Sequence, residues 1–175
     1  MKNIVFIVLS VLFIGCNQTN GVVVTFDDER SNAVRAHYQN YLNNDLEGLK
    51  SLWSPALKIY LNSTEASGIA DIAALITAQH ENFDNISMHF GEEEQEDLGV
   101  WVQSITYPPN AGYPETTYTQ TWFTWSATGK ASGETIEIPV HIGFEWADGK
   151  IIQEWHHFDP AKMMAELALA EAAAE

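Results

Sequence analysis

Residues 139–159 read PVHIGFEWADGKIIQEWHHFD, and this stretch decides the fold. Near its middle, Asp148-Gly149 is the strongest short-range signal for a two-residue β-hairpin turn. Residues that favour strands, β-branched and aromatic, lie on both sides of the pair. The sequence therefore predicts two long strands joined at Asp148-Gly149.

Counting outward from this turn predicts which residues pair. With a two-residue loop, Trp146 lies opposite Ile151 and His141 lies opposite His156. Side chains alternate between the two faces of a strand, so the hairpin separates into two sets. The apolar face carries Val140, Ile142, Phe144, Trp146, Ile151 and Trp155, with Gln153 and His157 among them. The other face carries His141, Gly143, Glu145, Ile152, Glu154, His156 and Phe158. A β-bulge would shift this register by one residue and exchange the faces.

The first residues have the pattern of a secretory signal peptide. A short basic segment, residues 1–3, precedes the apolar run 4–14, which is too short for a transmembrane helix of about 20 residues. The run ends at Gly15-Cys16, and Cys16 is the only cysteine. Residues 13–16, Phe-Ile-Gly-Cys, resemble a bacterial lipobox, which implies cleavage after residue 15 and a lipid anchor on Cys16. The protein would then be a lipoprotein of the periplasm or outer membrane. The alternative is a plain signal peptide in which Cys16 is incidental.

Charge and length narrow the class of protein. The net charge is −16, and cleavage after residue 15 would remove Lys2 and make it −17. So acidic a chain argues against nucleic acid as a partner and against electrostatic docking on anionic lipid. One cysteine excludes an intramolecular disulfide. We expect a tether over residues 16–27 and a single domain over residues 28–175.

Helical patterns come first and strand patterns follow. Helices are expected from Ser31, a plausible N-cap, over residues 45–53 and over residues 69–83. A short strand is expected at residues 58–61. The later strands are expected at residues 86–90, 99–107 and 116–128 and in the hairpin, before a C-terminal helix from Pro160. This order is typical of an α+β fold.

The order of elements and the end of the chain resemble the NTF2-like superfamily. The nearest groups are the SnoaL-like polyketide cyclases, limonene-epoxide hydrolases and ketosteroid isomerases. The resemblance covers residues 28–159, with a helix pattern around residues 38–53. Its motif residues are Asp148, Gly149, Lys150, Ile151, Trp155 and Asp159. The resemblance implies a cone: three N-terminal helices packed in a strongly bent antiparallel sheet, here followed by a C-terminal helix.

In the SnoaL-like and epoxide-hydrolase members of the resembled superfamily, an acidic residue of the last strand faces a conical pocket as acid or base. That position falls on His156, so an imidazole replaces the carboxylate and no particular activity carries over. If the polar face of the hairpin lines the pocket, the apolar face needs another cover. A second subunit is the natural cover for so large an apolar patch, and a homodimer is therefore expected.

Candidate site residues follow from this geometry. His156, His141 and Glu154 are the candidate catalytic residues, because an imidazole beside a carboxylate can move protons near neutral pH. Adjacent His156 and His157 point to opposite faces, so no metal site is expected. No phosphate-binding glycine loop is present, so no cofactor is expected. The candidate ligand-binding residues are Trp53, Tyr60, His89, Tyr118, Trp122 and Phe158.

Three functions remain open on the sequence. The first is a cofactor-independent enzyme, an isomerase, cyclase, lyase or hydrolase that uses histidine acid–base chemistry on a small, partly apolar molecule. The second is a lipoprotein that binds such a ligand without chemistry. The third is an interaction module that works through its dimer face.

Overall fold

The computed structural model describes residues 21–91 and 99–174. The predicted signal peptide and Cys16 lie outside these residues. Within them, helices and one seven-stranded sheet form an α+β fold, which confirms the predicted class. The helices are α1 (Glu29–Leu42), α2 (Leu46–Leu52), α3 (Ile69–Asn82) and α4 (Ala161–Ala174). The strands are β1 (Val23–Thr25), β2 (Trp53–Leu61), β3 (Phe83–His89), β4 (Trp101–Tyr107), β5 (Thr116–Gly129), β6 (Thr135–Ala147) and β7 (Lys150–His157).

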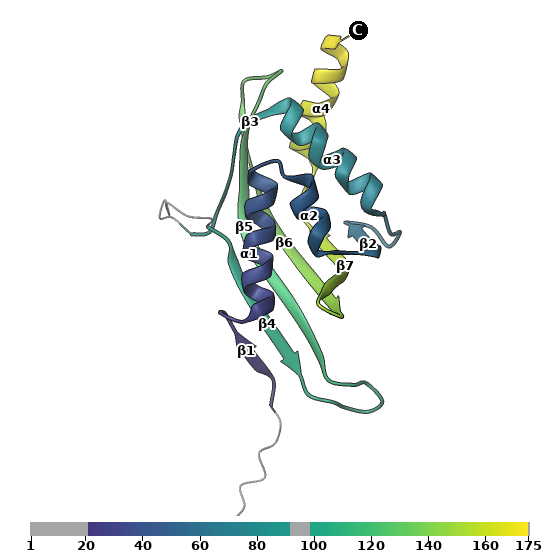
Figure 1. Cartoon of the computed structure of the whole chain (residues 1–175). Coiled ribbons are helices and arrows are strands. Elements are labelled where there is room, and N and C mark those ends of the chain that lie inside the picture. The colour runs from purple at the N-terminus through teal and green to yellow at the C-terminus, as the bar shows by residue number, and fades with distance from the viewer. Residues whose placement is uncertain (1–20, 92–98, 175) are drawn as a thin grey trace, which may run out of the picture.

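Two long strands, β5 and β6, form the centre of the sheet, whose order is β1-β4-β5-β6-β7-β2. One edge of β5 pairs first with β4 and further along with β3. Figure 1 shows α1 lying across these strands, with α2 and α3 beside it on the same side of the sheet. The helices therefore cover one face, called the inner face below, and leave the other, the outer face, uncovered by any described element.

The position of α1 is set by a cap that the sequence pattern placed one turn too late. Asp28, not Ser31, is the N-cap, and its Oδ1 accepts a hydrogen bond from the backbone N–H of Ser31 at 2.7 Å. Ser31 Oγ in turn accepts from the backbone N–H of Asp28, which completes a capping box. The helix then presents His37, Tyr38 and Tyr41 to the sheet, and all three are buried.

The expected spacer contributes to the sheet. Residues 23–25 form β1, which pairs antiparallel with β4. The short strand expected at residues 58–61 is also longer, because β2 begins at Trp53 directly after α2. Pro55 is accommodated within this strand, whose pairing with β7 is irregular between Trp53 and Lys58.

The hairpin forms at the predicted turn. Asp148 and Gly149 both have positive φ, 51° and 72°, as a two-residue turn of this kind requires. Trp146 pairs with Ile151 as predicted, but Glu145 pairs with Gln153, so Ile152 is an extra residue in β7. Beyond this bulge the predicted register is wrong by one residue, and His141 pairs with His157 instead of His156.

The bulge turns the apolar side of β6 and the polar side of β7 to the same face. Ile142 pairs with His156 and Phe144 pairs with Glu154, and all four side chains lie on the inner face. The apolar row of β6 is therefore covered by the protein's own helices. The sequence-based reason for a partner subunit, an apolar face left open, is contradicted by this arrangement.

Candidate functional site

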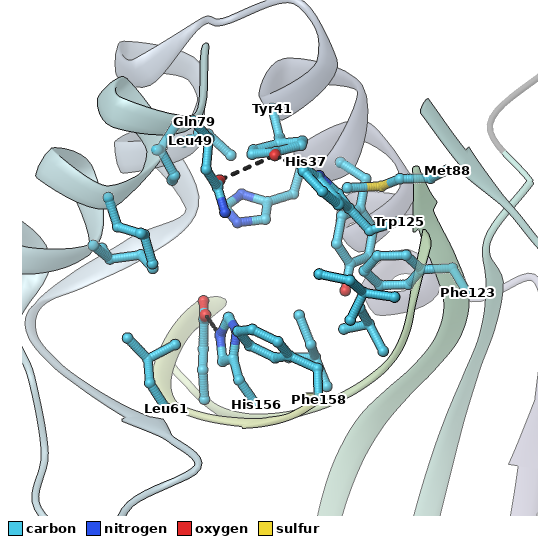
Figure 2. Close-up of a pocket in the computed structure, with 18 of the residues that line it drawn as sticks. His37, Tyr41, Leu49, Leu61, Gln79, Met88, Phe123, Trp125, His156 and Phe158 are labelled. Atoms are coloured by element: carbon cyan, nitrogen blue, oxygen red, sulfur yellow. Dashed lines mark hydrogen bonds and ion pairs between the residues drawn. The ribbon is translucent and has the colours of Figure 1, made fainter. Parts of the chain in front are cut away.

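A cavity of about 100 Å³ lies between the helices and the inner face of the sheet. Figure 2 shows side chains from α1 and α3 on one side of it and from β7 on the other. Most of the lining is apolar, for instance Leu49, Leu61, Ile72, Ile76, Phe123, Ile138, Ile142 and Phe144. Such a lining favours an organic ligand with an apolar body.

Three polar side chains form a connected group in the cavity wall. Glu154 of β7 is 2 % exposed and accepts two hydrogen bonds, each of 2.7 Å. One comes from Nε1 of Trp53, and the other joins its Oε2 to Nε2 of His156. Burial by itself raises the pKa of Glu154, but His156, His37 and Trp53 together outweigh this effect and the pKa is lowered. The carboxylate is therefore ionised at neutral pH.

The ionised carboxylate fixes the orientation of His156. A carboxylate can only accept hydrogen bonds, so Nε2 of His156 carries a proton and donates it. In the neutral imidazole the lone pair then resides on Nδ1. A histidine held by a carboxylate in this way can act as a base, and the carboxylate stabilises the imidazolium that forms.

His37 of α1 is a second cavity histidine, and the sequence reasoning missed it. It is 6 % exposed, and Figure 2 shows its ring on the side of the cavity opposite His156. Burial lowers its pKa to about 4, against the opposing effect of Glu154, so it is uncharged at neutral pH. Its spacing could have indicated this. His37 lies three residues after Val34 and four before Tyr41, which places it on the apolar side of α1.

A chain of hydrogen bonds closes the cavity beside His37. Trp125 Nε1 donates to Tyr41 Oη at 2.8 Å, and Tyr41 Oη donates to Gln79 Oε1 at 3.0 Å. Gln79 Nε2 then points to the sulfur of Met163 in α4 at 3.1 Å. These groups satisfy one another, so they provide a rigid wall instead of free partners for a ligand.

Four of the predicted site residues line the cavity: Trp53, Glu154, His156 and Phe158. His141 does not, and its predicted grouping with His156 is wrong. Because of the bulge at Ile152 it lies on the outer face, where its ring is 4.7 Å from that of Trp122 and 5.8 Å from that of His157.

The other predicted ligand-binding residues also lie away from the cavity. Tyr60, His89, Tyr118 and Trp122 alternate with inward-facing neighbours and point to the outer face. In β5 the odd-numbered residues face inward. Thr121 shows this, because its hydroxyl group lies 2.7 Å from that of Tyr38 in α1. On the outer face Trp155 lies between Tyr60 and Tyr118, at 6.3 and 6.1 Å between ring centroids.

Two further observations concern residues 21–91 and 99–174 only. No three His, Cys, Asp or Glu side chains there come together as they would around a metal ion. None of the helices in these ranges is both long enough and apolar enough to cross a membrane.

Solved structures resemble this architecture over nearly their whole length. AclR of Streptomyces galilaeus, provisionally assigned as a hydroxylase, is 15% identical and has a TM-score of 0.58, covering 80% of this chain and 96% of its own. An NTF2-like protein of unknown function from Burkholderia pseudomallei is 14% identical with a TM-score of 0.53, covering 81% of this chain and 98% of its own. The chain has the NTF2-like fold.

A third solved neighbour is IdmH of Streptomyces antibioticus, provisionally assigned as a polyketide cyclase. It is 15% identical with a TM-score of 0.56 and covers 81% of this chain and 99% of its own. No protein-family model matches the sequence, and a search of curated proteins finds no match. Identities this low establish the NTF2-like fold alone, so the activity has to be argued from the cavity.

Proposed function

We propose that this NTF2-like domain binds a small, partly apolar organic molecule in its cavity and catalyses a cofactor-free proton transfer on it. The observation that carries the proposal is the 2.7 Å contact between Nε2 of His156 and Oε2 of Glu154 at the wall of an otherwise apolar cavity. An oriented base that contacts a bound molecule typically contributes about 10²- to 10⁴-fold to a rate.

In the proposed chemistry the His156 imidazole acts first as a base and then as an acid. Nδ1 of His156 removes a proton from a carbon of the ligand, and the resulting imidazolium is stabilised by the Glu154 carboxylate. The same nitrogen returns the proton at another position, so the net change is an isomerisation, or a cyclisation where the carbanion attacks within the molecule. The apolar lining excludes water and strengthens the electrostatic interaction between the two side chains.

Deuterium exchange tests the proton transfer without knowledge of the substrate. A panel of small ketones is incubated with the domain in D2O, and deuterium at the α-carbon is followed by NMR. We expect incorporation above the buffer rate, lowered about 100-fold by His156→Gln and less by Glu154→Gln. His157→Gln, which changes a histidine on the outer face, is the matched control and should leave the rate unchanged.

The alternative is a ligand-binding protein without chemistry. Its support is the nearly apolar cavity, in which a ligand can be held by burial alone. Ketones that bind but exchange only at the buffer rate would favour this alternative over the enzyme.

We also propose an envelope anchor and a second subunit. Acylation of Cys16 would tie the domain to a membrane, and Cys16→Ser should then move the protein into the soluble fraction.

For a homodimer the outer face remains the proposed surface, now because of the rings of Tyr60, Tyr118 and Trp155. A mass in solution equal to one chain, or one unchanged by Trp155→Lys, would contradict this interface.

A further inference from the structure

His37 is the polar group in the cavity whose hydrogen bonding is incomplete. Within residues 21–91 and 99–174 its Nδ1 has no hydrogen-bond partner, although the atom is fully buried. The polar groups beside it, in Tyr41, Gln79 and Trp125, already satisfy one another. Because leaving a buried polar atom unpaired is costly, the unpaired nitrogen of a residue that lines the cavity indicates a missing partner.

The charge state of His37 limits what that partner can be. With a pKa of about 4 the imidazole is neutral, and it offers one N–H donor and one lone pair. It therefore suits an uncharged polar group such as a hydroxyl, carbonyl or amide. A carboxylate ligand would find no cation at His37 and would share the cavity with the ionised Glu154.

The size of the cavity limits the rest of the ligand. An apolar cavity of about 150 Å³ in another protein holds benzene, and the cavity here is about 100 Å³. A molecule of about one ring, or a short branched chain, therefore suits the space between the walls, and a longer one would extend through the open side of the cavity. Its apolar part would contact side chains such as Leu49, Ile76 and Ile142.

We propose that His37 is a ligand-binding residue, and that the cavity selects an uncharged molecule of about one ring whose single polar group bonds to the His37 imidazole. This inference rests on the proposed function, because it assumes that the cavity is a binding site. It assigns His37 to recognition and leaves proton transfer to His156 on the opposite wall (Figure 2).

Phenol and fluorobenzene test the inference, because they have nearly the same shape and differ in hydrogen bonding. We expect phenol to bind wild-type protein about tenfold more tightly than fluorobenzene in an NMR titration, as one added neutral hydrogen bond allows. His37→Phe should abolish the preference. His157→Phe, which changes a histidine of the outer face, should keep it, and addition of phenol should shift the His37 ring signals of the wild type.

The possible outcomes separate the role of His37 from the binding of ligands in the cavity. If wild-type protein binds both probes equally, or His37→Phe keeps the preference, the role of His37 is wrong while the cavity remains a binding site. If neither probe binds, the proposed function fails together with this inference. The wild-type comparison stands even if His37→Phe does not fold, and His37→Gln, which keeps a donor and an acceptor, should retain part of the preference.

Discussion

Replacing Glu154 with leucine should lower the free energy of unfolding by about 3 kcal/mol. The substitution removes the acceptor of two buried donors, Nε1 of Trp53 and Nε2 of His156, and leaves both without a partner in an apolar wall. Each unsatisfied buried donor costs about 1–3 kcal/mol. Urea denaturation at pH 7 measures the loss as a shift of the midpoint at constant slope.

Two further variants make the Glu154 result specific. Glu154→Gln keeps one acceptor oxygen and should lose about half as much. Glu145→Gln alters a carboxyl group on the outer face, where the bonded partner is Gln153, and should cost less than about 1 kcal/mol. If Glu154→Leu were as stable as the wild type, the free-energy cost of burying the Glu154 charge would equal the stabilisation from its hydrogen bonds. The Glu154 side chain would then not stabilise the fold.

Lowering the pH from 7 to 4 should remove about 3 kcal/mol of stability through His37 alone. In the unfolded chain this histidine titrates near pH 6.5, whereas burial holds its pKa near 4 in the folded protein. Between these values the unfolded state binds a proton that the folded state does not, so stability rises with pH across this window. A difference of about 2.5 pKa units corresponds to about 3 kcal/mol.

The His37 effect is isolated by comparison with His37→Phe, measured by urea denaturation at intervals from pH 4 to pH 7. The variant should show a flatter curve over this range. Glu154 adds a loss in the same direction as the pH falls below its ordinary pKa, because its folded-state pKa is lowered. His37 is one of the groups that lower that pKa, so His37→Phe reduces this contribution too and flattens the curve further. His141→Phe is the matched control on the outer face, where the pKa is also lowered by burial and the change in slope should be smaller. Parallel curves for wild type and His37→Phe would contradict the buried, neutral state.

The fold could be predicted from the sequence because its strongest signals are local. Asp148-Gly149 fixed the turn and the first pairs of the hairpin, and the helix and strand periods fixed the class. The bulge could not be predicted, because Ile151 and Ile152 are both apolar and the alternation that would reveal an extra residue is missing there. That one residue moved His141 out of the predicted site.

The candidate site was only half predictable for a related reason. In β5 large rings occupy both parities, as at Trp122, Phe123 and Trp125, so the inward set depends on which residues α1 contacts. His37 was missed because a histidine on the apolar side of a helix is ordinarily a core residue. Only the tertiary structure brings it to the same cavity as His156, which lies more than a hundred positions later in the sequence.

The central claim, that the ligand binds in the inner cavity and not on the outer face, is tested most directly by histidine NMR. Two histidines, His37 and His156, line the cavity, and two others, His141 and His157, stack on the outer face of the same sheet. Addition of phenol should shift the ring signals of the first pair and leave those of the second unchanged. Shifts confined to His141 and His157 would contradict the account.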